Sequence, residues 1–439
     1  MSRENFKYII VCEMKINIPY GEGSMCFDAS DGRVKAVLMQ KENAERDIRL
    51  PEAFVAEALE SPIGTPRLSE LATGKKNITI ITSDHTRPMP SAVTMPLLLK
   101  EVRKGAPDAN ILILIATGLH RATTQEEITE RFGAEICRNE NIIVHDCHDE
   151  KTLRHVGTLP SGGALVVSKY AADTDLLVAE GFIEPHFFAG FSGGRKSVFP
   201  GIAGYECVVS NHCSEFVADA NATAGVLKDN PIHRDMEFAA EQTGLSFILN
   251  VRLGKGGAIV DAVAGHPSIA HEEGCRRLME NVSVQCVRAP IVVTSNGGYP
   301  LDQNLYQLVK CMETAGKCCE EGGIIIAVGE CRDGAGGEAF YRDFAGGDEP
   351  RVLTERFLSR NRTETQTDQW QSQILARILE KHNVIVVAPL IEGIVKDMGL
   401  GWAGDIESAL GMADAMLERK PGGTADIVAI PDGPGVVIL

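Results

Sequence analysis

Polar side chains with acid–base or cationic chemistry follow directly after several apolar runs of this sequence. Histidine exchanges protons near neutral pH, and arginine and lysine bind carboxylates and phosphates. In open α/β sheets, ligands bind beyond the carboxyl ends of strands, so several strand ends that each deliver such groups predict a cleft site. The groups are Asp84, His85, Thr86 and Arg87 after "NITIITS", His120 after "NILILIATGL", Glu184, His186, Arg195 and Lys196 after "TDLLVAE", and Tyr299, Asp302, Tyr306, Gln307 and Lys310 after "APIVVTS".

Each of these groups also has a purely structural interpretation. Asp84 and Thr86 are good capping residues for a turn that enters a helix. His120 would then be a helix-entry residue, His186 a core histidine between apolar neighbours, and Lys310 a solvated lysine. The arrival of such groups at separate strand ends favours the functional interpretation, because an α/β cleft site is assembled in this way.

The stretch "GFIEPHFFAGFSGGRKSVFPGIAG", Gly181–Gly204, combines glycines, aromatic residues and cationic side chains. It is not a P-loop, since arginine stands where the second glycine of that motif belongs. Glycines followed by Arg195, Lys196 and a serine remain compatible with a phosphate held by backbone N–H groups. Further along, His212 lies beside Cys213 and is a possible ligand for a soft metal.

Apolar runs alternate with amphipathic segments from about residue 75 onward, which predicts a doubly wound, largely parallel sheet. "SAVTMPLLLKEVRKG" predicts a helix that stops at Gly105, and Thr123 or Thr124 with Glu126 or Glu127 predicts a capping box for the next helix. The pattern restarts near residue 285. We therefore expect two α/β domains, 1–284 and 285–408, with 409–439 returning to the first.

Composition and charge narrow the class of protein. The net charge of -17 argues against a general nucleic-acid-binding protein, which needs a basic surface. No charged-then-apolar leader opens the sequence and no apolar run approaches about 18 residues, so a cytoplasmic protein without a membrane segment is expected. The 12 cysteines are scattered without a Cys-x-x-Cys pair, which favours reduced thiols over disulfides or structural zinc.

Several long motifs, taken in order, resemble the nickel-pincer-nucleotide-dependent lactate racemase family. They are "SDHTRP", "ATGLHR", "EPHFFAGFSGGRKSVFPGIAG", the "NH" that contains His212, and "GGYPLDQNLYQ". The resemblance covers most of the chain. It implies a two-domain α/β protein with its active site in the interdomain cleft, and no core catalytic position departs from the family pattern.

The resemblance also implies a cofactor, a nickel-bearing pyridinium-3-thioamide-5-thiocarboxylic acid mononucleotide. Lys196 matches the lysine to which this pincer nucleotide is covalently attached, and His212 matches the histidine that completes the nickel coordination. Gly193 and Gly194 would let the backbone approach the planar cofactor closely. Separate biosynthetic proteins would be needed to supply it.

The matched residues around the substrate have implied roles as well. His120 and His186 match a pair of acid/base histidines. Arg87 and Lys310 match cationic residues that hold and polarise the substrate, and Gln307 matches a neighbouring polar contact.

The remaining matches concern the nucleotide and the pocket wall. Asp84 and Thr86 match the loop that meets the phosphate or ribose of the nucleotide. Phe188, Tyr306 and Trp370 look like positions that line the substrate pocket, although "TDQWQSQ" around Trp370 is a short match.

The implied activity is the racemisation or epimerisation of a small 2-hydroxy acid such as lactate. Removal of the α-hydrogen as hydride avoids a dianion that has no electron sink, and a histidine takes the hydroxyl proton. Alternatives are an epimerase of a larger sugar acid or of a malate-type acid with the same cofactor, and a non-catalytic protein that binds the cofactor or an organic acid. The sequence gives no indication of an oligomeric state.

Overall fold

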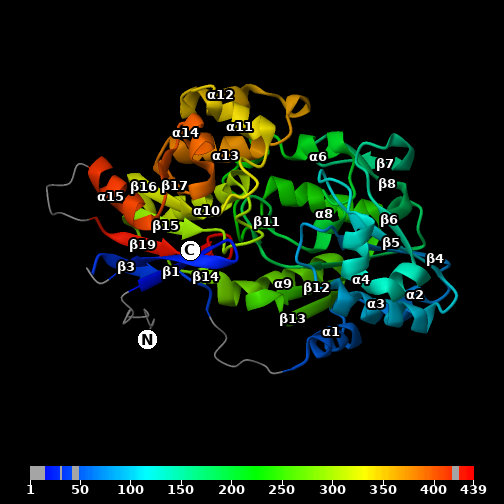
Figure 1. Ribbon diagram of the computed structural model, residues 1–439. Coiled ribbons are helices and arrows are strands. Elements are labelled where there is room, and N and C mark those ends of the chain that lie inside the picture. Colours follow the sequence, from blue (N-terminus) through cyan, green and yellow to red (C-terminus); the bar gives the residue numbers. More distant parts are fainter. Residues whose placement is uncertain (1–14, 30–31, 42–48, 418–424) are drawn as a thin grey trace, which may run out of the picture. The chain divides into compact units, whose positions relative to one another are not determined.

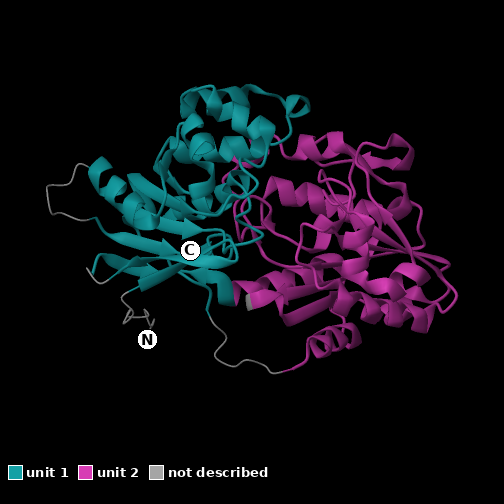
Figure 2. Ribbon diagram, in the orientation of Figure 1, with its two compact units in different colours: residues 1–42, 281–439 teal, residues 43–280 magenta. Residues whose placement is uncertain are grey.

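The computed structural model describes residues 15–29, 32–41, 49–417 and 425–439, and it divides into two compact units (Figure 2). Unit 1 contains residues 1–42 and 281–439, and unit 2 contains residues 43–280. Each unit has its own six-stranded sheet and its own apolar core. Two α/β units with largely parallel sheets, as expected from the alternating pattern, are confirmed.

The sheet of unit 2 has the strand order β13-β12-β9-β4-β5-β6, in which only the β12–β13 pair is antiparallel (Figure 1). The central strand β9 is buried at every residue, as a parallel strand covered on both faces must be. The strands are β4 (Asn77–Ser83), β5 (Asn110–Ala116), β6 (Asn141–Val144), β9 (Leu176–Phe182), β12 (Leu245–Leu253) and β13 (Ile259–Gly265).

The helices of unit 2 follow the predicted signals closely. Helix α3 (Ser91–Gly105) ends at the predicted glycine, and α4 (Gln125–Asn139) is capped by Thr124 with a complete Thr124–Glu127 capping box. The other helices are α1 (Pro51–Glu60), α2 (Leu68–Ala72), α5 (Lys169–Ala172), α6 (Tyr205–Asn211), α7 (Ser214–Ala218), α8 (Pro231–Thr243) and α9 (Pro267–Val282), which runs just past the unit boundary.

Two short hairpins and a 3-10 helix also belong to unit 2. A small hairpin joins β10 (Pro185–His186) to β11 (Gly190–Phe191), and the 3-10 helix η2 (Gly194–Ser197) follows it. A second hairpin pairs β7 (Leu153–Thr158) with β8 (Ala164–Ser168). Because β9 ends at Phe182, the β10–β11 hairpin and η2 begin at its carboxyl end.

The sheet of unit 1 is parallel throughout, in the order β18-β17-β16-β15-β19-β3. Its strands are β3 (Val34–Val37), β15 (Ala289–Ser295), β16 (Cys319–Val328), β17 (Asn383–Val387), β18 (Gly401–Ala403) and β19 (Ile427–Ile430). Its helices are α10 (Leu305–Cys318), α11 (Glu338–Ala345), α12 (Pro350–Ser359), α13 (Gln369–Leu379), α14 (Glu392–Asp397) and α15 (Ile406–Met416). Two short pairs complete it, β1 (Lys15–Tyr20) with β2 (Gly23–Asp28) and β14 (Ser283–Val284) with β20 (Val437–Ile438).

The division of the chain differs from the expected boundaries at both termini. Residues 1–42 belong with the later part of the chain rather than with 43–280, and the segment 409–439 stays in unit 1 instead of returning to the first domain. The reason is strand pairing: β19 lies between β15 and β3, and all of its residues are buried. An apolar strand predicts a sheet position but not which sheet, because parallel neighbours are often distant in sequence.

Candidate active site

The loop after β4 and the loop after β5 meet at Asp84 and His120. The Asp84 carboxylate lies 2.7 Å from His120 Nδ1 through Oδ2, and its Oδ1 accepts a 2.6 Å hydrogen bond from the Thr86 hydroxyl. Arg87 Nη1 in turn donates to the Thr86 hydroxyl at 3.0 Å. The structure therefore joins four of the predicted site residues in one hydrogen-bonded chain.

The charge of Asp84 determines the state of the His120 ring. Burial by itself raises the pKa of the Asp84 carboxyl, but the hydrogen bonds and charges of His120, Thr86 and Arg87 outweigh it and lower the pKa to about 2. An ionised carboxylate only accepts, so in the neutral form of the His120 ring the proton is on Nδ1 and the lone pair is on Nε2. The His120 side chain is 44% exposed, so its ring is accessible from outside the loop.

A half-buried arginine and a buried glutamate support the backbone around this loop. Arg131 of α4 donates through Nη2 to the carbonyl oxygens of Asp84 and Arg87, at 2.7 and 2.8 Å. The Glu180 carboxylate accepts from the hydroxyls of Thr82, Ser91 and Thr94 at 2.5 to 2.6 Å, and burial raises its pKa. Sequence reasoning did not select either residue; the only signal was a glutamate within the apolar run "LLVAEGF".

A second cluster gathers His186, Lys196 and His212 around the ring of Phe188. The Phe188 ring centroid lies 4.6 Å from that of His186 and 5.2 Å from that of His212, both edge-on. The Lys196 ammonium lies 5.9 Å from the same centroid, within range of a cation–π contact. The structure thus brings together the residues predicted as acid/base, tether, metal ligand and pocket wall in the stretch 186–212.

His212 is held in the neutral form that a metal requires. It follows the last residue of α6, and its Nδ1 donates to the carbonyl oxygen of Val208 at 3.1 Å, which leaves the lone pair on Nε2. Burial, together with the nearby Lys196 charge, lowers the pKa of His212 to about 3. A neutral imidazole oriented by a backbone carbonyl is the usual arrangement of a metal-ligating histidine.

His186 differs from His120 in the nitrogen that carries its proton. The backbone N–H of Ala189 donates to His186 Nδ1 at 3.2 Å, so the proton of the neutral ring is on Nε2. His120 therefore offers a proton acceptor at Nε2, whereas His186 offers a hydrogen-bond donor there. For His186 to act as a base at Nε2, its ring must exchange tautomers and give up the Ala189 contact.

Gly193 and Gly194 are required by packing within the chain. Both have positive φ, 75° and 52°. A Cβ on Gly193 would lie 2.8 Å from Asn250 Oδ1, and one on Gly194 would lie 2.7 Å from the His271 ring. The Gly194 N–H also donates to Asn250 Oδ1 at 2.8 Å. The structure thus explains these glycines without a cofactor.

The remaining predicted residues belong to unit 1. Tyr306, Gln307 and Lys310 lie within the first two turns of α10, and the indole N–H of Trp370 donates to the Tyr306 hydroxyl at 3.0 Å. Gln307 Oε1 is buried without a hydrogen-bond partner among the residues that the structure describes. The structure brings Trp370 next to Tyr306, although the sequence around Trp370 is only a short match to the family pattern.

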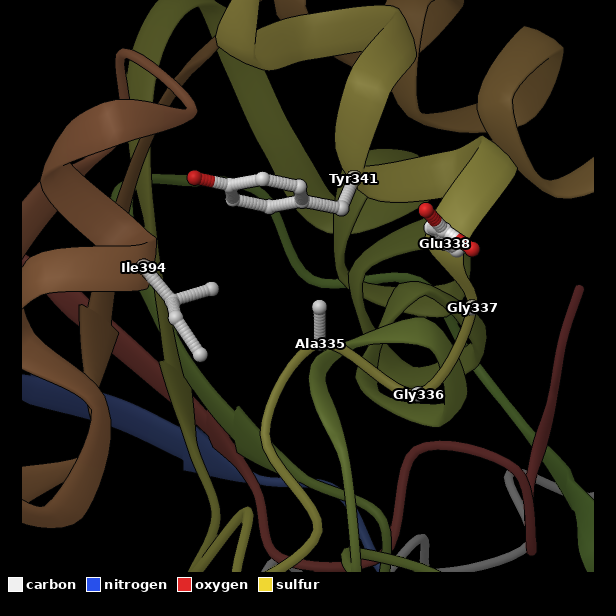
Figure 3. Close-up of a pocket in the computed structure, with 6 residues that line it drawn as sticks. All are labelled: Ala335, Gly336, Gly337, Glu338, Tyr341 and Ile394. Carbon is white, nitrogen blue, oxygen red and sulfur yellow. The ribbon is translucent and has the colours of Figure 1, made fainter.

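The glycine-rich loop in "GECRDGAGGEAF" supports the start of α10. The carbonyl oxygens of Gly334 and Ala335 accept hydrogen bonds from the N–H groups of Leu305 and Tyr306, at 3.1 and 2.9 Å. Beside it lies a cavity of about 300 Å³ (Figure 3), which contains none of the predicted site residues. Its lining residues are Ala335, Gly336, Gly337, Glu338, Tyr341 and Ile394.

Neither a membrane-spanning helix nor a protein-only metal cluster is found within the described ranges. None of the helices there is long and apolar enough to cross a bilayer. In the same ranges no three histidine, cysteine or acidic side chains gather as ligands for one ion.

Comparison with known proteins gives matches over nearly the whole chain. Residues 20–225 match the family model described as lactate racemase N-terminal domain, and residues 284–438 match the lactate racemase C-terminal domain. The chain is 50% identical over 424 residues to a lactate racemase of Thermoanaerobacterium thermosaccharolyticum, covering 96% of this chain and 99% of the relative. It is 43% identical, with the same coverage, to a lactate racemase of Lactiplantibacillus plantarum.

Solved structures give the same result for the fold. The lactate racemase apoprotein of Thermoanaerobacterium thermosaccharolyticum superposes with a TM-score of 0.93 at 50% identity, covering 97% of this chain and 100% of that one. A Thermotoga maritima protein superposes with a TM-score of 0.62 at 17% identity, covering 91% of this chain and 99% of the other, and shows likeness of fold alone.

Proposed function

Because the chain belongs to the lactate racemase family and is thus an isomerase, we propose that it interconverts the enantiomers of a 2-hydroxy acid, with lactate as the first candidate. Two relatives named lactate racemase, each aligned over 96% of this chain, support this choice. The reaction would use His120 and His186 as acid/bases and a nickel-pincer nucleotide attached to Lys196.

The observation that carries the proposal is the Asp84–His120 pair. At 2.7 Å from an ionised carboxylate, His120 is fixed in the tautomer whose Nε2 accepts a proton. When His120 takes the hydroxyl proton of one enantiomer, Asp84 stabilises the imidazolium that forms. The carboxylate, hydroxyl and histidine thus form a unit that holds and moves one proton.

The residues around Phe188 fit the implied cofactor. His212 is buried and neutral with its lone pair on Nε2, and imidazole nitrogen is a good ligand for nickel. The Lys196 amine would form the covalent tether, and both it and His212 lie close to the Phe188 ring. When bound, the cofactor supplies a hydride acceptor for the α-hydrogen, so that the hydroxy acid is oxidised to a flat keto acid and reduced again.

The chain's other residues bind and orient the substrate in this proposal. Arg87, steadied by Thr86, would pair with the substrate carboxylate, and Lys310 and Gln307 would add polar contacts. His186 would take the hydroxyl proton of the other enantiomer, whose hydroxyl points away from His120. Phe188, Tyr306 and Trp370 would line the pocket.

A panel of chiral 2-hydroxy acids, assayed with protein produced alongside the cofactor-biosynthesis enzymes, tests the function. We expect interconversion of D- and L-lactate, and an intact mass that shows an adduct lost in Lys196→Ala. Turnover of a malate-type or sugar acid in preference to lactate would replace the proposed substrate. Full activity in the double variant His120→Ala/His186→Ala would refute the acid/base assignment.

A further inference from the structure

We propose that Arg195, next to the tether, is a positioning residue that fixes the backbone on which His186 and Lys196 are carried. The proposal rests on the function assigned above to those two residues. Sequence reasoning counted Arg195 among the cationic groups of a ligand site, but the structure turns its guanidinium inward. It is fully buried, and among the described residues it is the largest side chain of which this is true.

The Arg195 guanidinium holds the β10–β11 hairpin by donating hydrogen bonds to backbone carbonyl oxygens of the hairpin. Nη2 donates to Ala189 O at 2.7 Å and Nη1 donates to Phe191 O at 2.8 Å, with a longer contact of 3.4 Å to Gly193 O. These carbonyls lie between His186, on β10, and Lys196, in η2. One side chain therefore holds three carbonyl groups of the segment that joins the proposed base to the proposed tether.

Two histidines on neighbouring helices, His233 and His271, contact the guanidinium in turn. Nε of Arg195 donates to His233 Nδ1 on α8 at 3.0 Å. His271 Nε2, on α9, lies 2.8 Å from Ser192 O and 3.2 Å from Arg195 Nη1. The contact with Ser192 O is the shorter one, so His271 Nε2 carries the proton and donates it to that carbonyl oxygen. His271 therefore binds the same loop directly and packs against Arg195.

All the groups that contact the guanidinium are neutral. Burial and the Arg195 charge lower the pKa of His233 to about 3 and the pKa of His271 well below its usual value. Within the described ranges no direct ion pair to Arg195 is found, so its hydrogen bonds go to backbone carbonyls and an imidazole, and the Glu237 carboxylate acts on its charge only from a distance. A buried cation without a direct ion pair is costly, and the five donors of a guanidinium in a fixed fork are what hold several acceptors at once.

Arg195→Lys is the direct test, because it keeps the charge and removes the fork. Displacing a catalytic group by about 1 Å costs about 100-fold in rate. We therefore expect cofactor-loaded Arg195→Lys to lose about 10- to 100-fold in kcat, with KM within about 3-fold and faster amide exchange confined to residues 185–197. Arg252→Lys, at a partly buried arginine paired with Asp261, is the matched control and should leave kcat unchanged.

A pair of substitutions at His233 keeps the test valid if Arg195→Lys does not fold. Asparagine can place an acceptor near the position of Nδ1, whereas leucine cannot. His233→Leu should lower kcat about 10-fold, and His233→Asn should recover most of that loss. Equal kcat in His233→Leu and the wild type, or in a folded Arg195→Lys, would overturn the inference. Wild-type protein that carries the adduct but racemises no hydroxy acid would instead refute the proposed function.

Discussion

Replacement of Asp84 by asparagine separates the charge of this residue from its shape. Oδ1 of Asp84 accepts from both the N–H and the hydroxyl of Thr86, at 3.1 and 2.6 Å, so the amide oxygen of the Asp84→Asn side chain is expected on that side. The amide NH₂ would then face His120 Nδ1 as a donor. His120 must respond by moving its proton to Nε2, which removes the lone pair that takes the substrate proton.

The magnitude follows from the bond that is lost. A hydrogen bond to a charged group contributes about 1.5–3 kcal/mol, which corresponds to about 10- to 150-fold in rate when it acts in the transition state. The 2.7 Å contact between Asp84 Oδ2 and His120 Nδ1 is short enough for the upper part of this range. Asp84→Asn should therefore lower kcat about 100-fold.

The assay is steady-state racemisation of D- and L-lactate by cofactor-loaded protein, with adduct content measured by intact mass. Asp175→Asn is the matched control, because Asp175 Oδ2 accepts from the backbone N–H groups of Lys76 and Asn77 at the opposite end of β4. That variant should keep its kcat. An Asp84→Asn enzyme with full adduct and kcat within about 2-fold of wild type would refute the claim that Asp84 sets the His120 tautomer.

Other consequences concern the metal, the pocket wall and acid stability. His212→Ala should reduce bound nickel per protein strongly, measured by elemental analysis, whereas the exposed His155→Ala should not. Trp370→Phe removes the 3.0 Å hydrogen bond from the indole N–H to the Tyr306 hydroxyl. Such a hydrogen bond contributes about 0.5–1.5 kcal/mol, so the KM for lactate should rise about 2- to 10-fold. An unchanged KM would show that Trp370 does not line the substrate pocket. Asp84 has its pKa lowered from 3.8 to about 2, so it stabilises the fold above about pH 4 and this contribution is lost as pH falls toward 2. The urea-unfolding difference between wild type and Asp84→Asn should shrink from about 1–2 kcal/mol at pH 6 to nearly zero at pH 2; a constant difference would contradict it.

Local signals predicted the elements well, because they act over a few residues. The apolar runs became β4, β5 and β9, and the capping box at Thr124 formed as the spacing indicated. Assignment of β19 to its sheet failed because strand partners are chosen by the packing of the whole unit.

The candidate site shows the same limit at the level of side chains. Sequence motifs selected His120 and Asp84, but only coordinates show that one orients the other. Arg195 was selected for its charge and proved to bind the backbone of its own loop. Whether a cation faces a ligand or the interior depends on side-chain direction, which no short motif encodes.

The central claim, that the α-hydrogen moves as hydride while histidines move the hydroxyl proton, has one direct measurement. L-lactate is racemised in D₂O by cofactor-loaded protein, and the α-carbon of the D-lactate formed is analysed for deuterium. Internal return of the hydride predicts racemised lactate that keeps its original α-hydrogen. Rapid α-deuteration that matches the rate of racemisation would show proton abstraction and contradict it.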